Sequence, residues 1–209
     1  MSNRIEMKPP LSAHGTLAPS EWVQRWAHLV PPRGTVLDVA CGHGRHLRWF
    51  AEQNHPVVGV DWSPDDTKSV ADLIASGNAE VVLADLEGGP WPFPVNGRHG
   101  TFDAVVVTNY LWRPLLPAIV GSVAPGGVLI YETFAAGNET VGKPSRADFL
   151  LQPGELLAAC AGLRVVAFED GFLQGPDRFV QRIVAARASA RELPARYQLK
   201  FPPGRPKEI

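Results

Sequence analysis

Residues 35–46 read Thr-Val-Leu-Asp-Val-Ala-Cys-Gly-His-Gly-Arg-His, and this stretch decides the fold. Apolar residues lead into Asp38, and a loop of small residues with two glycines follows. Beyond the loop, Leu47, Phe50 and Ala51 have the i, i+3, i+4 spacing of one apolar helical face. A strand, a glycine loop and a helix therefore succeed one another. At such a junction, backbone N–H groups and a helix N-terminus can approach a ligand closely.

The loop at residues 40–44 fits neither of two common glycine-loop patterns. The dinucleotide fingerprint requires a third glycine, and Leu47 stands at that position. A phosphate-binding P-loop requires a Lys-Ser/Thr pair, which this loop lacks. An NAD-dependent oxidoreductase nevertheless stays open as an alternative, because such enzymes also carry an acid after the second strand.

The rest of the chain repeats this unit. Nearly continuous apolar runs begin near Val36, Val57, Val81, Ala104 and Val128, at intervals of 21, 24, 23 and 24 residues. Continuous rather than alternating runs are typical of strands buried on both faces of a parallel sheet. Helices are expected between the runs and before the first one, over residues 19–30, 64–76, 115–123 and 153–161. Two strands, 163–169 and 178–186, lack a crossover helix and must therefore be antiparallel.

Composition indicates one globular domain. The chain has 209 residues, of which 45% are hydrophobic and 20% charged, and its net charge is −1. No apolar run approaches the ~20 residues of a membrane helix, and two cysteines make no disulfide framework, so we expect a cytoplasmic protein. We divide it into an N-terminal arm and helix (1–32), a main domain (33–189) and a flexible basic tail (190–209).

The pattern Asp38-x-Ala40-x-Gly42-x-Gly44, with Asp61, Asp85 and the turn Pro125-Gly126-Gly127, resembles the class I S-adenosylmethionine (SAM) methyltransferases. The resemblance covers roughly residues 33–187, and Ala40 stands where the family has its first glycine. Three later stretches, residues 109–115, 131–134 and 142–156, are similar to bacterial methyltransferases of the tellurite-resistance type. The resemblance implies an α/β fold, a seven-stranded doubly wound sheet in the order 3-2-1-4-5-7-6 with an antiparallel last strand.

The resemblance also implies a cofactor site beyond the carboxyl ends of the strands, where open α/β sheets bind ligands. Asp61 is expected to bind the ribose, Asp85 the adenine amino group and Asp38 the methionine amino group. Arg45 either meets the methionine carboxylate or forms a surface salt bridge. The full expected set is Asp38, Ala40, Gly42, Gly44, Arg45, Asp61, Trp62, Asp85, Leu86, Thr108 and Asn109.

The methyl acceptor is expected to be a small molecule. The chain lacks the Asn/Asp-Pro-Pro-Tyr/Phe and Pro-Cys motifs of enzymes that methylate adenine and cytosine. A nucleic-acid acceptor bound by the basic tail, and SAM binding without turnover, stay open as alternatives. No metal is indicated, and a monomer or homodimer is expected.

Tyr110, Glu132 and Arg146 are the candidate catalytic residues, and Trp112, Arg113 and Phe134 are further candidates near the acceptor. Glu132 is expected to pair with Arg113 or Arg146, or to act as an acid–base group. Residues 134–152 lack periodicity and are bounded by apolar anchors, which predicts a mobile lid over the acceptor. Cys41 is explained more simply by its small size than as a nucleophile.

Overall fold

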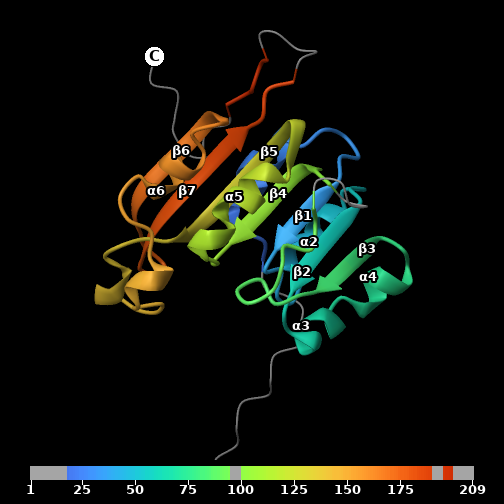
Figure 1. Cartoon of the computed structure of the whole chain (residues 1–209), viewed down its shortest axis with the longest axis horizontal. Helices are drawn as coiled ribbons and strands as arrows, with labels where there is room; N and C mark the ends of the chain where they lie inside the picture. The colour runs from blue at the N-terminus through green and yellow to red at the C-terminus, as the bar shows by residue number, and fades with distance from the viewer. Residues whose placement is uncertain (1–17, 95–99, 190–194, 200–209) are drawn as a thin grey trace, which may run out of the picture.

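A computed structural model of the chain describes residues 18–94, 100–189 and 195–199. Its centre is a seven-stranded sheet in the order β3-β2-β1-β4-β5-β7-β6 (Figure 1). Neighbours among β1 to β5 pair in parallel, and β7 is antiparallel to both β5 and β6. The predicted order and direction are confirmed. The strands are β1 Val36–Val39, β2 Val57–Asp61, β3 Ala79–Leu83, β4 Phe102–Thr108, β5 Val123–Phe134, β6 Arg164–Leu173 and β7 Arg178–Ala186.

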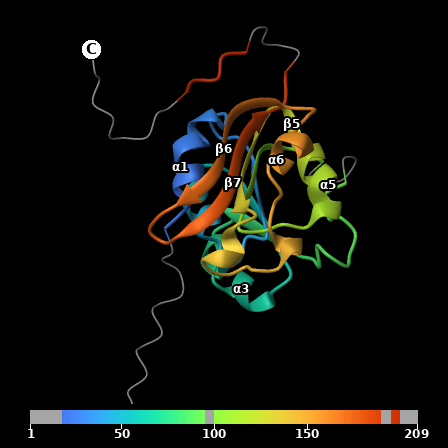
Figure 2. The same cartoon turned by 90° about the vertical axis from the view of Figure 1, so that its left-hand side faces the viewer.

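Helices cover both faces of the sheet, with α1 on one side and α5 and α6 on the other (Figure 2). Trp22 and Phe50 pack into the apolar layer on the α1 side, whereas Ile119, Tyr131 and Leu156 pack into the opposite layer. The α-helices are α1 Glu21–Trp26, α2 Arg45–Ala51, α3 Pro64–Lys68, α4 Ala71–Ala75, α5 Leu116–Gly121 and α6 Glu155–Ala159. The described residues also form four 3-10 helices: η1 Ala27–Leu29, η2 Arg113–Leu115, η3 Asn138–Thr140 and η4 Ala147–Phe149.

Two elements differ from the prediction. The helix expected over 64–76 is divided into α3 and α4, because Val70 turns inward and packs, fully buried, beneath the glycine loop. A Cβ at Gly44 would come 2.2 Å from Cγ1 of Val70, so these two residues fit closely. β5 begins at Val123, ahead of the expected run, and the Pro125-Gly126-Gly127 turn lies within it beside a register shift against β4.

The predicted terminal segments lie largely beyond this description. Residues 1–17 of the arm, and 190–194 and 200–209 of the tail, are outside the described residues. Within the described ranges, the helices are all too short or too polar to cross a membrane.

Candidate active site

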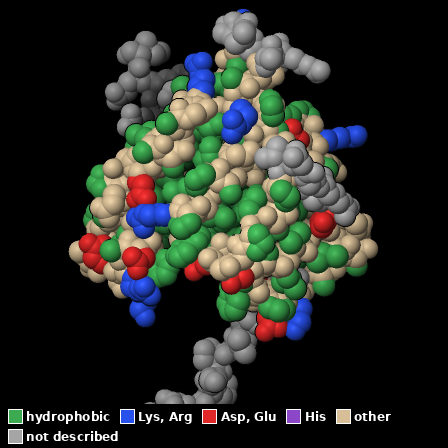
Figure 3. All heavy atoms as spheres, in the orientation of Figure 1, with side chains coloured by type: hydrophobic (Ala, Val, Ile, Leu, Met, Phe, Trp, Pro, Cys, Tyr) green, Lys and Arg blue, Asp and Glu red, His purple; other side chains and the backbone are tan. Residues whose placement is uncertain are grey.

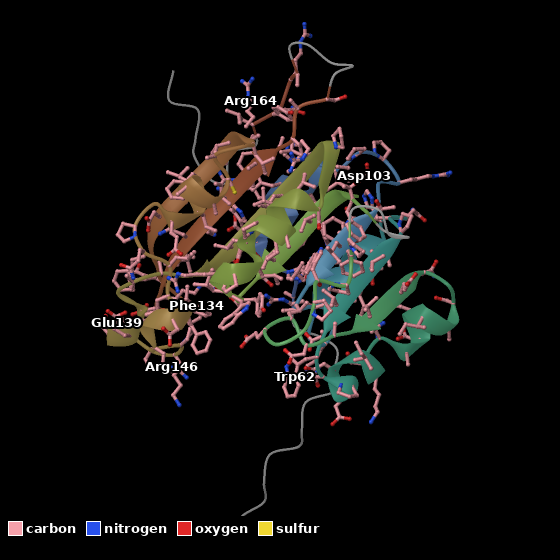
Figure 4. The ribbon with its side chains drawn as sticks, in the orientation of Figure 1. Trp62, Asp103, Phe134, Glu139, Arg146 and Arg164 are labelled. Carbon is pink, nitrogen blue, oxygen red and sulfur yellow. The ribbon has the colours of Figure 1, made fainter. Side chains whose placement is uncertain are left out.

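A cavity of about 470 Å³ opens at the carboxyl ends of β1, β2 and β3. Its volume lies within the ~300–1,000 Å³ that small-molecule sites usually have. The molecule is notched at this edge (Figure 3), where Trp62 and Phe134 lie, and Asp103 and Arg164 lie at the opposite edge (Figure 4). The cavity is lined by Ala40, Asp61, Trp62, Asp66, Asp85, Leu86, Glu87 and Tyr110.

Asp61 ends β2 and fastens two loops together. Its Oδ2 accepts a hydrogen bond from the Gly42 backbone N–H at 2.8 Å, and its Oδ1 accepts one from the Ser63 N–H at 3.0 Å. A carboxylate has about four acceptor positions, so these two bonds leave capacity for ribose hydroxyls. The side chain is 5% exposed and lines the cavity, which suits a ligand-facing acid.

The loop after β1 has left-handed backbone at three positions, with φ of +54° at Ala40, +50° at Gly42 and +72° at Gly44. Glycine adopts this conformation without steric cost, whereas alanine is strained. Ala40 therefore keeps the loop shape that the family pattern assigns to glycine. Nothing lies within 4 Å of a Cβ built on Gly42, so that position stays open for a close approach.

Asp38 points away from this cavity, into the layer beneath α1. It is 1% exposed, and its Oδ2 lacks a hydrogen-bond partner among the described residues. The ring of His46 lies close by, but its Nδ1 is 3.7 Å from this oxygen, beyond hydrogen-bond range. A buried carboxylate oxygen without a donor fits a ligand that supplies one.

The loop after β3 contributes Asp85 and Leu86. Oδ1 of Asp85 accepts backbone N–H bonds from Gly88 and Glu87, each at 3.0 Å, and these bonds lower the pKa of Asp85. These two bonds form an Asx turn at Asp85, and the side chain still lines the cavity. Trp62, opposite, is 76% exposed and presents a free aromatic surface.

A second cavity of about 280 Å³ adjoins the first, because Glu87 and Tyr110 line both. Its other lining residues are mostly apolar and come from the ends of β4 and β5 and from residues 144–149. They are Asn109, Leu111, Thr133, Phe134, Pro144 and Phe149. The predicted acceptor-side residues Tyr110 and Phe134 are thus brought together beside the first cavity.

Tyr110 is suited to donating a proton in a hydrogen bond and not to acting as a base. Burial raises the pKa of its phenol, and the carboxylates of Glu87, Asp85 and Asp61 raise the pKa further. Its hydroxyl is buried without a hydrogen-bond partner among the described residues. Burial, with the charges of Asp38 and Asp61, also raises the pKa of Cys41, which removes a nucleophilic role for that thiol.

The expected pairing of Glu132 with Arg113 or Arg146 is wrong. Glu132 is 2% exposed and accepts hydrogen bonds from Ser20 Oγ at 2.9 Å and Arg182 Nη1 at 3.4 Å. Successive residues of a strand point to opposite faces. Thr133 therefore faces the second cavity while Glu132 faces α1, and Glu132 has no place among the acid–base candidates.

Arg113 and Arg146 both make their contacts with residues in or next to segment 134–152. Arg113 pairs with Glu155 at 2.6 Å and donates to the carbonyl oxygens of Asp148 and Leu150, each at 2.8 Å. Arg146, whose side chain is 73% exposed, pairs with Asp148 at 2.9 Å and lies over the Phe149 ring. Neither guanidinium lines the cavities, so the expectation that Arg146 meets Glu132 is also wrong.

Two backbone hydrogen bonds join the two ends of segment 134–152. The Ala136 N–H donates to Leu151 O at 2.9 Å, and the Leu151 N–H donates to Phe134 O at 3.0 Å. Between these ends lie η3 and η4, and Pro144 and Phe149 face the second cavity. The segment therefore supplies part of the wall of the second cavity, while its role as a mobile lid stays a prediction.

The remaining expected contacts lie near the loop. Arg45 Nη2 donates to Thr108 Oγ1 at 3.2 Å, and the Asn109 N–H donates to Glu132 O at 2.9 Å. Two neighbours were missed from sequence. Asp66 lines the cavity and pairs with His43 at 2.7 Å, but its position in the sequence indicates only an acid in the first turn of a helix. The position of Glu87 indicates only a turn residue.

Other features of the described residues do not extend the site. A cavity of about 550 Å³ lies at the amino ends of β1 to β3, and it shares no residue with the two cavities above. Among the described residues, no three His, Cys, Asp or Glu side chains are grouped as metal ligands.

Residues 36–127 match a family model described as a methyltransferase domain. The chain thus carries a methyltransferase domain over these residues, within a sheet of the class I order. SAM is the cofactor of such domains, and the oxidoreductase alternative is thereby removed. The matched residues contain the glycine loop, the four carboxylates of the first cavity and the ends of β1, β2 and β4, so the family match and the cavity coincide.

Two curated relatives and one solved structure are similar to this chain. The chain is 29% identical over 144 residues to a tRNA U34 carboxymethyltransferase of Pseudoalteromonas translucida, covering 60% of this chain and 42% of that relative. It is 25% identical over 130 residues to the putative methyltransferase YqeM of Bacillus subtilis, covering 57% and 50%. The chain thus spans half or less of the length of these relatives. TehB from Haemophilus influenzae shares the fold, with TM-score 0.65, 19% identity, and 82% and 63% coverage.

Proposed function

We propose that this methyltransferase transfers a methyl group from SAM to a small molecule held in the second cavity. The observation that carries the proposal is the adjoining of two unlike cavities. One is lined by four carboxylates and an exposed indole, and the other is mainly apolar. Glu87 and Tyr110 belong to both, so a donor in the first cavity and an acceptor in the second would meet beside them.

The residues of the first cavity fit the nucleoside half of SAM. We assign the ribose hydroxyls to Asp61, and the adenine to Trp62, Leu86 and Asp85. The methionine half is assigned to the opposite side of the glycine loop, where Asp38 has an oxygen without a donor and Arg45 lies against Thr108. A methionine ammonium is a suitable donor for that oxygen, and Ala40, Gly42, Gly44 and Asn109 would supply backbone contacts.

Bound SAM supplies an electrophilic methyl group on a positively charged sulfur. The protein residues then need to align the acceptor and exclude water, which together provide most of the acceleration in such displacements. Phe134 and Phe149 supply apolar walls for this purpose, and Thr133 and Asn109 supply polar groups that can orient the acceptor. Tyr110, whose phenol stays protonated, is assigned an orienting role rather than proton abstraction.

The charges around the cavities indicate which acceptors fit. Among the described residues, neither cavity is lined by a Lys or Arg, and Glu87 carries the one charge of the second cavity. Placing an anion beside carboxylates in a partly buried site is unfavourable. We therefore assign the acceptor to neutral or cationic molecules with an aromatic or other apolar body.

A nucleic-acid acceptor is the alternative, since one relative is a tRNA U34 carboxymethyltransferase. Binding of polyanions usually rests on Lys and Arg contacts to phosphates. The chain carries a net charge of −1, and carboxylates surround the cavity mouth. These charges support the small-molecule acceptor over tRNA.

The test is methyl transfer from labelled SAM to three matched probes: indole, tryptamine and indole-3-acetate. Bulk tRNA is the fourth acceptor. We expect transfer to indole or tryptamine and little or none to the carboxylate. Labelling of tRNA alone would overturn the small-molecule proposal. SAM binding without product across a wider panel of neutral and amine acceptors would make the chain a binding module. Phe149→Ala should lower turnover while leaving cofactor affinity unchanged.

A further inference from the structure

His46 connects three parts of the fold beneath the glycine loop. It lies in the first turn of α2 and is 2% exposed. Its Nε2 accepts a hydrogen bond from the Ser20 backbone N–H at 3.1 Å, and its Nδ1 faces Oδ2 of Asp38 at 3.7 Å. Ser20 in turn caps α1 and donates its hydroxyl proton to Glu132. The imidazole therefore stands between the end of β1 and the start of α1.

The Ser20 contact determines which ring nitrogen carries the proton. A backbone N–H is always a donor, so Nε2 must be the acceptor. The ring hydrogen of a neutral imidazole then resides on Nδ1, the nitrogen that faces Asp38. The Asp38 carboxylate therefore meets a polar N–H on one side, too distant for a hydrogen bond, and Oδ2 keeps an open position.

We infer that His46 is a positioning residue for the amino-acid half of the cofactor. Its Nδ1–H attracts the Asp38 carboxylate and fixes the orientation in which Oδ2 accepts the ligand's ammonium group. The inference rests on the cofactor orientation proposed above. An uncompensated buried carboxylate is costly, and an ammonium group compensates it. The α1 start, held through Ser20, keeps the imidazole in place.

Two substitutions separate this role from simple anchoring of α1. Glutamine places its amide oxygen near the position of Nε2, so His46→Gln retains an acceptor for the Ser20 N–H and loses the donor toward Asp38. Asparagine places its amide nitrogen near the position of Nδ1, so His46→Asn retains the donor and loses the acceptor. The pair thus removes one function of the ring at a time.

Two ligands that differ in the amino-acid half separate the two parts of the proposed cofactor site. S-adenosylhomocysteine carries the amino-acid half, and 5′-methylthioadenosine lacks it while keeping the adenosine and the sulfur. Calorimetric titration of the full chain with each measures the two halves of the site without any methyl transfer. A defect in folding or in the adenosine cavity changes both affinities, whereas a defect in positioning Asp38 changes only the first.

For His46→Gln we expect about a tenfold loss of S-adenosylhomocysteine affinity with 5′-methylthioadenosine unchanged. A misoriented Asp38 would lose its hydrogen bond from the ligand's ammonium group, and hydrogen bonds to charged groups contribute at this level. His46→Asn should bind both ligands nearly as the wild type does and melt at a lower temperature. The inference is overturned if His46→Gln binds S-adenosylhomocysteine normally, or if it loses both ligands equally.

Asp38→Asn keeps the inference testable if His46→Gln does not fold. It removes the charge at constant shape, and the same selective loss of S-adenosylhomocysteine is expected. Equal binding of that ligand by Asp38→Asn and the wild type would overturn the inference. The proposed function fails differently, since it requires product formation, and normal ligand affinities with no methylated acceptor would overturn that proposal alone.

Discussion

The hydroxyl of Ser20 donates to Oε1 of Glu132 at 2.9 Å, joining two residues 112 positions apart in the chain. The Oγ atom of Ser20 also accepts hydrogen bonds from the backbone N–H groups of Trp22 and Val23 and so caps α1. Glu132 also faces Arg182, which pairs with Glu169 and lies over the Trp22 ring. One hydroxyl thus fastens α1 to the centre of the sheet.

Ser20→Ala should lower the free energy of unfolding by about 1–2 kcal/mol, because both a helix cap and a bond to a buried carboxylate are lost. The backbone N–H bond to His46 survives this change, so affinity for S-adenosylhomocysteine should stay within about twofold. Urea unfolding and calorimetry measure the two quantities. Ser76→Ala, at an exposed serine, is the control and should change stability by less than about 0.5 kcal/mol.

Asp61→Ala should weaken S-adenosylhomocysteine binding roughly 10- to 100-fold, because a hydrogen-bonded carboxylate contributes ~1.5–3 kcal/mol. The change also frees the Gly42 N–H, which Asp61 holds at 2.8 Å. Asp65→Ala is the matched control, since Asp65 is exposed and outside the cavity. Unchanged affinity in folded Asp61→Ala, or an equal loss in the control, would contradict the ribose assignment.

Ala40→Gly should raise the free energy of unfolding by up to about 1 kcal/mol. Alanine at φ +54° is strained by ~1–2 kcal/mol, and glycine removes that strain at some cost in chain entropy. Ala159→Gly in α6 should instead destabilise by about 0.5–1 kcal/mol. Thermal melts of both variants distinguish the positions, and a destabilised Ala40→Gly would show that the strain is not relieved.

The pair of Arg113 and Glu155 makes stability depend on pH. Burial raises the pKa of Glu155, but hydrogen bonds from Arg113 and the Gln152 N–H outweigh burial and lower it. A lowered pKa in the folded state stabilises above the unfolded value of about 4.3 and is lost as pH falls through the folded value. The stability difference between wild type and Glu155→Gln should therefore shrink as pH falls from about 6 toward 3. A stability difference that stays constant over this pH range would exclude this pair as the source of the pH dependence.

Replacing residues 137–146 by a Gly/Ser linker should lower methyl transfer at least about tenfold and leave SAM affinity within a few-fold. The replacement removes Pro144 from the second cavity but keeps Phe134 and Phe149. An equal loss of SAM binding would place the segment in the cofactor site. Unchanged turnover would make it a linker.

Much of this architecture follows from the sequence. The apolar runs from Val36 to Val128 are continuous because both faces of the sheet are covered, so a parallel sheet could be predicted from them. The strand order came instead from the resemblance of the glycine loop and its acids to the class I methyltransferases. The direction of Glu132 could not, since a shift of one residue along β5 exchanges the two faces. The pairing of Arg113 with Glu155 was equally hidden, because 42 residues separate them and only the folded chain brings them together.

The two backbone bonds to Asp61 have a consequence for the order of events in binding. The amides of Gly42 and Ser63 have their hydrogen-bond acceptor within the protein itself, on the Asp61 carboxylate. Their hydrogen exchange with solvent should therefore be slow before any ligand arrives and change little afterwards. The ligand then meets a preformed rim, and the loss of conformational entropy on binding falls on Trp62 and on the ligand rather than on the glycine loop.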